Sequence, residues 1–332
     1  MSTAAVNPSA PAVIEKGSSL WADAWRRLSK NRAAMISLFL LAAIFLSCLI
    51  LPAIPGFLSD PGAQNLEMKN FPPSKEHYFG TDHLGRDLFS RIFYGGRVSI
   101  MVGLITTFVS VSIGITWGAI SGYVGGRLDA LMMRIVDILY ALPFLVIVIL
   151  LGAVLTPQTE KLTEFTVKLF AGSADTASVN EMRTTIEPFT TLVPLFIAIG
   201  ALSWLTISRI VRAQVQSVAK LEFVEAARSL GLSHSRILFR QILPNTLGPI
   251  IVYTTLTIPG VMLFEATLSF LGLGVKPPNS SWGILIEEGA NRMLSNPRLL
   301  LFPALFFSTT LFALNFLGDG LRDALDPKSS KD

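Results

Sequence analysis

Residues 225–245 read EAARSLGLSHSRILFRQILPN, and they lie in a polar segment that separates two long apolar stretches. The run Glu225-Ala226-Ala227 predicts a short helix of small residues. Within it an acid and a base, Glu225 and Arg228, face each other across one turn. Gly231 permits the turn that ends this helix. Such a helix can press closely against a partner, so we expect a docking element. The alternative is an ordinary surface helix that contains the same tripeptide.

A second helix is expected after this turn. Ser233 is a favourable residue to cap its start, and Ile237, Leu238 and Ile242 give it an apolar face. Leu243-Pro244 then leads into the next apolar stretch. The order of tripeptide, glycine and Leu-Pro between two membrane stretches is more specific than any one of these features.

The composition indicates a membrane protein. Of the 332 residues, 51% are hydrophobic and only 15% are charged, whereas soluble domains carry about 25% charge. The net charge of +4 does not indicate nucleic acid, because the basic residues lie mostly at the ends of apolar runs. The single cysteine, Cys48, lies within such a run, so no intrachain disulfide is possible. The three histidines are scattered, and no metal site is expected.

Six apolar runs are long enough to span a bilayer, which takes about 20 residues. The chain is therefore predicted to be an all-α polytopic membrane protein with six transmembrane helices. The expected spans are Met35–Ile54, Ser99–Tyr123, Arg134–Leu155, Thr191–Val211, Leu247–Gly272 and Leu299–Gly318.

An even number of spans places both termini on the same side, and the positive-inside rule makes that side the cytoplasm. The predicted inner segments hold a modest majority of the 27 Lys and Arg residues. Residues 1–19 are small and polar and are expected to be a disordered tail. Residues 20–96 are interpreted as an N-terminal region with the first span and an outer segment, 97–318 as the core, and 319–332 as a cytoplasmic tail.

The outer loop after the third span, residues 156–187, is long and mostly polar. Within it, Thr159–Ala171 has Leu162, Phe165 and Leu169 at helical spacing, and Gly172 is suited to end a helix. This segment is either a short helix on the outer surface or a passive insertion.

Two acids near or within spans require an explanation. Glu265 lies in an apolar run, where an acid costs about 2.5–3.5 kcal/mol on insertion scales. It either touches a permeation path or has a structural role inside the protein or at its outer interface. Asp137 has Arg134 three residues before it, and this pair is interpreted as local structure rather than a proton relay.

Motifs for catalysis are absent from the sequence. It has no GxxxxGK[ST] loop to bind ATP phosphates, and no G-x-S-x-G or H-E-x-x-H motif. The chain is therefore predicted not to be an enzyme, and the energy for any transport must come from a partner or from an ion gradient.

Several separated blocks resemble one family, the permeases of ATP-binding-cassette importers, and within it the second permease of dipeptide and oligopeptide importers. The Glu-Ala-Ala segment resembles the loop that docks on the ATPase in these proteins. The resemblance extends from about residue 20 to residue 328, and Gln241 departs from it, since His or Ile is expected there. The other matching blocks are FGTDHLGRD (79–87), YGGRVS (94–99), RIVD (134–137) with Pro143, EATLSFLGLG (265–274), SWG (281–283) and GDGLRDALDP (318–327).

The resemblance implies a type I importer permease fold in the inner membrane. It implies pairing with a second homologous permease, two ATP-binding subunits and an extracytoplasmic substrate-binding protein. Coupling would involve Glu225, Ala226, Ala227, Arg228, Gly231, Leu243 and Pro244. ATP would be used by the partners, so no cofactor is expected in this chain. Dipeptides, oligopeptides, glutathione and nickel chelates all remain possible ligands.

Two other classes of protein were weighed. A secondary transporter would use an ion site at Glu265 or Asp137, but such folds often show internal repeats, and no convincing repeat is present. A membrane-embedded enzyme would need a catalytic constellation, and none is found.

Overall fold

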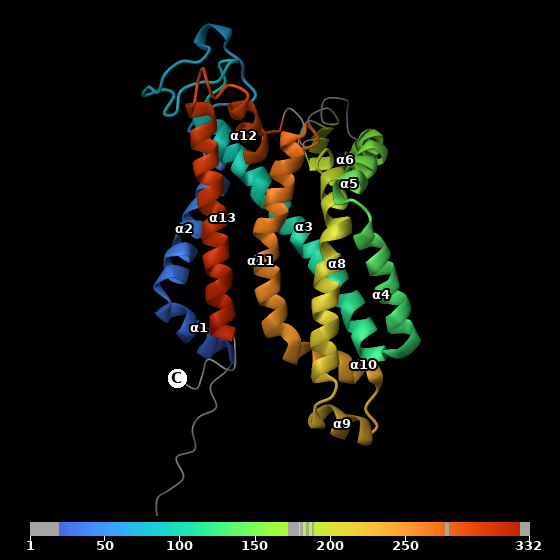
Figure 1. The fold of residues 1–332 in the computed structure, drawn as a ribbon. Helices are drawn as coiled ribbons and strands as arrows, with labels where there is room; N and C mark the ends of the chain where they lie inside the picture. The colour runs from blue at the N-terminus through green and yellow to red at the C-terminus, as the bar shows by residue number, and fades with distance from the viewer. Residues whose placement is uncertain are drawn as a thin grey trace, which may run out of the picture.

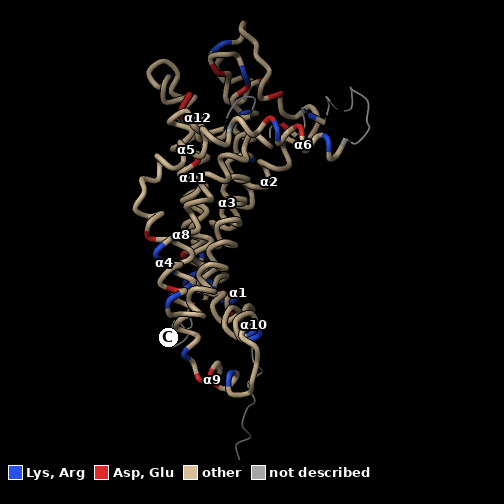
Figure 2. The backbone as a smooth tube through the Cα atoms, turned by 90° about the vertical axis from the view of Figure 1, so that its right-hand side faces the viewer, with Lys and Arg blue, Asp and Glu red and all other residues tan. Residues whose placement is uncertain are grey.

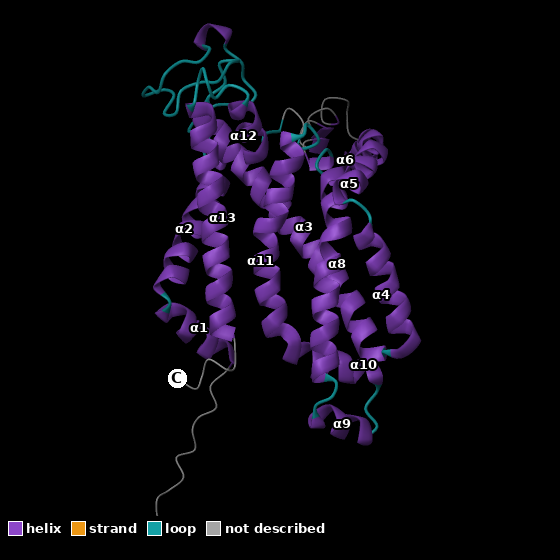
Figure 3. Ribbon diagram, viewed as in Figure 1, coloured by secondary structure: helices purple, strands orange, loops and turns teal. Residues whose placement is uncertain are grey.

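The computed structural model describes residues 20–171, 189–275 and 279–325, with a few positions between 179 and 187. Most of the described residues are helical, the main exception being the long loop segment that precedes α3 (Leu88–Val124) at one end of the molecule (Figure 3), and they form no sheet strands. An all-α membrane fold was predicted, and this prediction is confirmed. The expected disordered tail at residues 1–19, the expected helix end at Gly172 and the final residues 326–332 lie outside the described part of the chain.

The helices run mostly along one direction (Figure 1). For orientation we call the end with α9 the inner end and the opposite end, with α12, the outer end. The helices are α1 (Leu20–Lys30), α2 (Arg32–Ile50), α3 (Leu88–Val124), α4 (Gly126–Ala141), α5 (Phe144–Leu155), α6 (Thr159–Ala171), α8 (Val193–Val218), α9 (Glu222–Ser229), α10 (His234–Ile237), α11 (Leu243–Phe270), α12 (Trp282–Ala290) and α13 (Arg298–Leu325).

Five helical stretches among the described residues are long and apolar enough to cross a membrane. They are Arg32–Ala53, Leu88–Val124, Val193–Val218, His234–Phe270 and Arg298–Leu325. The pair α4 and α5 makes a sixth span if the two helices are counted together. Charged residues gather toward the two ends of the molecule, and the middle is largely free of them (Figure 2), as a membrane protein requires.

The third expected span, Arg134–Leu155, is not one continuous helix. α4 and α5 meet at an angle of 90°. Leu142, between them, is extended with φ −81° and ψ 138°, which is the conformation favoured before proline because the Pro143 ring crowds the preceding residue. Pro143 was noticed in the sequence, but the size of the bend was not predicted.

The last expected span was also too short, since α13 continues past Gly318 to Leu325. The first part of the predicted tail is therefore helix. It packs against α1 and the start of α2, where Leu28 of α1 and Ala34 of α2 join Ala324 in a small apolar cluster. A Cβ on Gly320 would lie 2.4 Å from the Cβ of Ala34, so glycine is needed for this contact.

α3 and α8 cross the bundle in close backbone contact. The glycines at 114, 118 and 122 lie on one face of α3, each about one turn after the last. A Cβ on Gly118 would lie 2.4 Å from the carbonyl oxygen of Ser208 and 2.8 Å from the Cβ of Val211. Small residues at this spacing let membrane helices approach closely, so this face of α3 fixes the position of α8.

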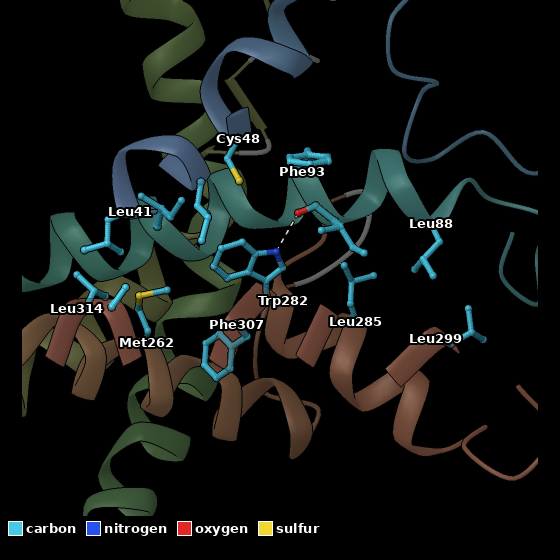
Figure 4. Packing of buried hydrophobic residues seen from close by; sticks show 14 residues of the cluster. Leu41, Cys48, Leu88, Phe93, Met262, Trp282, Leu285, Leu299, Phe307 and Leu314 are labelled. Atoms are coloured by element: carbon cyan, nitrogen blue, oxygen red, sulfur yellow. Dashed lines mark hydrogen bonds between the residues drawn. The ribbon is translucent and has the colours of Figure 1, made fainter. Parts of the chain in front are cut away.

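The outer half of the bundle is built around Trp282, which is fully buried. Its indole Nε1 donates a hydrogen bond of 2.9 Å to the carbonyl oxygen of Ile92 in α3. Figure 4 shows Cys48, Met262 and Phe307 around the same ring. The side chain therefore joins α2, α3, α11 and α13 to α12.

Of the two alternatives for the long outer loop, the structure has the short helix, with the bounds Thr159–Ala171. It lies across the direction of the spanning helices at the outer end (Figures 1 and 2). The hydroxyls of Thr163 and Thr190 share a hydrogen bond of 2.5 Å that holds it to the start of α8.

The glycine contact generates the first prediction. We expect Gly118→Ala to lower the free energy of unfolding by about 1–3 kcal/mol, the usual cost of overpacking. Gly260→Ala is the matched control, because a Cβ at Gly260 in α11 meets nothing within 4 Å. Thermal unfolding of the two detergent-purified variants should show a loss of Tm for the first only. Equal Tm values would mean that α3 and α8 do not depend on this close approach.

Candidate functional site

The helix α9 projects from the inner end of the molecule, beyond the ends of the spanning helices (Figure 1). Val224 is fully buried and Ala227 nearly so, at 7% exposed. The other predicted residues of this helix, Glu225, Ala226 and Arg228, are exposed. One face of α9 therefore attaches it to the protein and the opposite face is free for a partner. Val224 was not singled out from the sequence, although its spacing of three from Ala227 is the helical signal.

Gly231 ends α9 in the way the sequence predicted. Its φ is +73°, a left-handed conformation that glycine adopts without strain. The Gly231 amide donates to the carbonyl of Arg228 at 3.0 Å, and the Leu232 amide donates to the carbonyl of Ala227 at 3.2 Å. These two bonds form a Schellman motif, which sets the direction in which the chain leaves the helix. Leu230 within this turn is 82% exposed.

The expected pairing of Glu225 with Arg228 is not formed among the described ion pairs. The Arg228 guanidinium instead lies 5.8 Å from the centre of the Tyr123 ring. The Tyr123 hydroxyl also lies 2.9 Å from Nδ1 of His234. Tyr123, at the inner end of α3, is thus a functional candidate that the sequence did not indicate, because no local pattern links it to a segment more than 100 residues away.

The second helix of the segment begins at His234, directly after Ser233. The Ser233 side chain makes no capping hydrogen bond, so the expected cap is wrong in its chemistry though right in its position. Ile237, Leu238 and Ile242 are all buried, which confirms the predicted apolar face.

Leu243-Pro244 has a clear local effect. Proline lacks an amide hydrogen, and its ring collides with the carbonyl four residues earlier in a regular helix. Here the chain widens into a π-helix at Leu238–Ile242, and the Leu243 amide donates to the carbonyl of Leu238. The side-chain amide of Asn245 donates to the carbonyl of Gln241 at 2.6 Å. The helix therefore passes through Pro244 into α11 without ending.

These helices form one unit with the inner ends of α3 and α8. An apolar cluster joins α9 and the π-helix to the two spans; its fully buried members are Val211, Val215, Val224, Ile237 and Ile242. Packed side chains rather than a loose loop therefore connect α9 to α8 and to the helix that leads into α11.

Ion pairs hold α4 to α8 near the same end. Asp129 accepts two hydrogen bonds of 2.5 Å from the Arg212 guanidinium. Asp137 accepts one of 2.6 Å from Arg209, and that guanidinium also lies 4.2 Å from the ring centre of Tyr140. The expected pairing of Asp137 with Arg134 is therefore replaced by a contact between helices. Its interpretation as structure rather than a proton relay is consistent with this pairing.

Glu265 is completely buried. Its carboxylate accepts hydrogen bonds from the hydroxyls of Ser269 and Ser281, both at 2.7 Å, and from Ser99 at 3.2 Å. Ser281 also caps the start of α12, since its hydroxyl accepts from the Ile284 amide. The acid therefore joins α3, α11 and α12. This geometry favours the structural role over a permeation role, the two alternatives that the sequence left open.

At the outer end, four charged groups hold the segment before α3 against α12. The Arg91 guanidinium donates to Asp82 at 2.7 Å and to Glu288 at 2.6 Å. Arg86 donates to the same two carboxylates, at 2.7 Å and 3.2 Å. This quartet accounts for two of the three bases, at 86, 91 and 97, that run against the positive-inside rule in the first outer segment.

The charges of the quartet alter the acidity of its members. Burial opposes the ionisation of Asp82 and so raises its pKa. The charge of Arg91, the backbone hydrogen bonds and the charge of Arg86 together outweigh this effect, and the pKa of Asp82 is held below its usual range. Burial and Arg91 act in the same way on Glu288, and its pKa is also lowered. Ligand atoms of Asp82, His83 and Glu288 lie within 4.8 Å of one another. A cation would have to displace the two arginines, so this cluster is better explained as an ionic clamp.

Comparisons with known proteins give consistent results. Residues 114–331 match the family described as the inner membrane component of binding-protein-dependent transport systems. Residues 19–73 match the N-terminal transmembrane domain of oligopeptide transport permease C. The oligopeptide transport system permease protein OppC of Haemophilus influenzae is 45% identical over 94% of this chain and 90% of its own length.

Two further relatives are similar over nearly their whole length. OppC of Escherichia coli K12 is 44% identical over 94% of this chain and 93% of its own length. The dipeptide transport system permease protein DppC of Bacillus subtilis is 40% identical over 97% of this chain and 90% of its own length.

The ionic clamp generates the second prediction. Arg91→Met leaves the buried carboxylate of Asp82 and the partly buried carboxylate of Glu288 with less compensating charge. Removing one partner of a buried ion pair typically costs about 3–5 kcal/mol. We expect a large loss of Tm, while Lys75→Met, an exposed change of the same kind in the same segment, should leave Tm unchanged. Equal Tm values for the two variants would rule out a stabilising role for the clamp.

The lowered pKa values also fix the pH dependence. Their stabilising effect is fully present above the unfolded pKa values, about 3.9 for Asp and 4.3 for Glu, and is lost as the pH falls through the folded values. The Tm of the wild-type protein should therefore be steady from pH 8 to 5 on account of these groups. The Tm difference between wild type and Arg91→Met should shrink below about pH 4.

Proposed function

The chain belongs to the family of inner membrane components of binding-protein-dependent transport systems, and from this premise we propose how it couples ATP to peptide import. It is a multi-pass permease subunit of an ATP-driven importer for peptides, and it is not the ATPase subunit. Membership also implies partner ATPases and a substrate-binding protein. The surface that receives the ATPase, the second permease and the membrane orientation are our proposals.

We place the ATPase contact on the exposed face of α9. The observation that supports this is an apolar tip on a firmly attached helix: Leu221, Phe223 and Leu230 are exposed while Val224 and Ala227 anchor the other side. Exposed apolar groups of this kind are common where a protein partner docks. Beside these apolar residues lie Glu225, Ala226 and Arg228. The two charged side chains give the surface its charge, and the small Ala226 lets a partner approach closely.

The proposed mechanism follows from this attachment. When ATP binding closes the two ATPase subunits, they push on Glu225–Gly231. Because α9 is packed on α8 and on the helix that runs through Leu243-Pro244, the push tilts α8 and α11. Access to the path then changes from the outer to the inner side. ATP remains in the partners, and this chain needs no cofactor of its own.

The transport path is proposed to lie between this chain and a second, homologous permease. The interior of the described bundle is filled by apolar clusters, and Glu265, which is completely buried, is engaged by three hydroxyls. A polar peptide therefore passes along a face of the bundle rather than through it. The choice between dipeptides, oligopeptides and related ligands is assigned to the binding protein.

A secondary transporter is the second candidate, and the structure gives it little support. A proton or sodium site needs an acid that a solvated path can reach. Glu265 is enclosed, and Asp137 is paired with Arg209.

The third prediction concerns coupling. Proline cannot adopt the positive φ of Gly231 and also removes the Schellman amide, at a cost of about 3 kcal/mol or more. Gly231→Pro should abolish ATP-dependent uptake of a labelled tripeptide while the chain is still inserted. Gly231→Asn is the matched control, because asparagine tolerates the left-handed region, and it should retain uptake.

Glu225→Lys tests the charge of the same surface. We expect it to prevent co-purification of the ATPase subunits and to reduce uptake to background, whereas Glu225→Gln should be milder. If both variants, Gly231→Pro and Glu225→Lys, were expressed normally and took up peptide at the wild-type rate, the proposed docking role of α9 would be wrong.

The fourth prediction concerns orientation. The helix α1 and the C-terminal end of α13 lie at the same end of the molecule as α9 (Figure 1). We propose that this end faces the cytoplasm. In a Cys48→Ala background, Lys168→Cys in α6 should react with an impermeant maleimide added outside intact cells. Ser233→Cys should react only after the cells are opened. Labelling of both from one side would show that the span count is wrong.

A further inference from the structure

The helix α6 divides into three sectors that differ in chemistry. Thr163 and Val167, one turn apart, are buried against the protein. Phe165 and Leu169, also one turn apart, are 64% and 67% exposed, and the adjoining Phe170 is 70% exposed. The charged residues Glu160, Lys161, Glu164 and Lys168 occupy the remaining sector and are exposed. An exposed apolar stripe on a helix with a charged side is the pattern of a helix that lies in a membrane interface.

The position of α6 fits the same interpretation. It follows α5 directly through the short turn Thr156–Gln158, and α4 and α5 together are apolar enough to make a span. α5 exposes a row of apolar side chains, namely Leu145, Val146, Ile149, Leu150 and Val154. Because α6 turns across the bundle axis at the outer end (Figure 2), its apolar stripe continues this exposed surface at the depth where the spans end.

The two lysines of α6 lie along the edge of the apolar stripe that borders the charged sector. Lys161 and Lys168 are about two turns apart and so lie on one line of the helix. On a helical wheel this line is next to Phe165, while Glu160 and Glu164 lie further round toward the buried sector. Lysine side chains beside an apolar face extend their ammonium groups to the lipid headgroups. The stripe thus faces acyl chains, the lysines reach the phosphates and the acids remain in water.

We propose that α6 is an interfacial helix of the outer leaflet, with Phe165 and Leu169 inserted at the boundary between headgroups and acyl chains. Its partner is the lipid bilayer. The inserted helix holds the outer ends of α5 and α8 at a fixed depth, through the turn after α5 and the hydrogen bond between Thr163 and Thr190. This assigns a role to the outer loop that neither the transport family nor the coupling surface supplies.

The test measures depth at single positions in the complete importer. Phe165→Cys and Leu169→Cys, each in the Cys48→Ala background, are labelled with the fluorophore NBD and reconstituted into lipid nanodiscs. The matched controls are Glu160→Cys and Glu164→Cys on the charged sector of the same helix. Each sample is quenched separately by aqueous iodide and by phosphatidylcholine with a nitroxide at carbon 5 or carbon 16 of the acyl chain.

Interfacial helices bury their apolar face about 5–10 Å into this boundary. NBD at 165 and 169 should therefore be quenched strongly by the carbon-5 nitroxide, weakly by the carbon-16 nitroxide and weakly by iodide. NBD at 160 and 164 should show the reverse preference, for iodide over lipid.

Two results would overturn the proposal. Equal iodide quenching at all four positions would mean that α6 is a solvated insertion. Protection of 165 and 169 from both quenchers would mean that a protein subunit covers the stripe. Neither result depends on the transport assay, so failure here would leave the proposed function intact.

Discussion

The close contact between α3 and α8 is the constraint on which the rest of the structure depends. It requires glycine on α3, since a Cβ at Gly118 would meet the backbone of α8. The same α3 reaches both ends of the molecule. At its outer end Arg91 and Ser99 hold α12 in place, and at its inner end Tyr123 contacts the segment that follows α8. A change in the angle between these two helices is therefore felt at both faces of the membrane.

The segment from α9 to the start of α11 is a firmly held connection rather than a loose loop. The Schellman turn at Gly231 fixes the exit from α9, and the π-helix lets the chain enter α11 through Pro244 without a break. In both devices the backbone amide and carbonyl groups form hydrogen bonds within the chain. In an irregular loop the same groups would be bonded to water. The outer end is stabilised differently, by Glu265 with its three hydroxyl donors and by the ionic clamp around Arg91. Hydrogen-bonded polar groups at buried positions favour one arrangement of helices, and both sets of contacts hold α12 at the outer end.

Much of this could be predicted from the sequence, because the signals were local. Apolar runs located the spans, and helical spacing identified Ile237, Leu238 and Ile242 as buried. Gly231 was recognised by the conformation that it alone adopts easily. The missed features depend on partners distant in the chain. Arg228 contacts Tyr123 rather than Glu225, and Asp137 pairs with Arg209. The 90° bend comes at the extended Leu142 before Pro143, and the proline alone did not indicate its size. The end of α13 was placed too early because the apolar run ends at Gly318, whereas the helix continues to Leu325. Gly318 itself allows α13 to pack closely on Leu256 of α11.

The central claim is that this chain converts ATP use by a partner into peptide movement and has no energy source of its own. Reconstitution in proteoliposomes tests this most directly, with labelled tripeptide uptake as the readout. With the second permease, the ATPases and the loaded binding protein, uptake should require ATP, resist an uncoupler and persist in Glu265→Gln. The chain alone should move no peptide under a proton or sodium gradient. Uptake by the chain alone that persists without ATP, and that is lost with an uncoupler or in Glu265→Gln, would contradict the account.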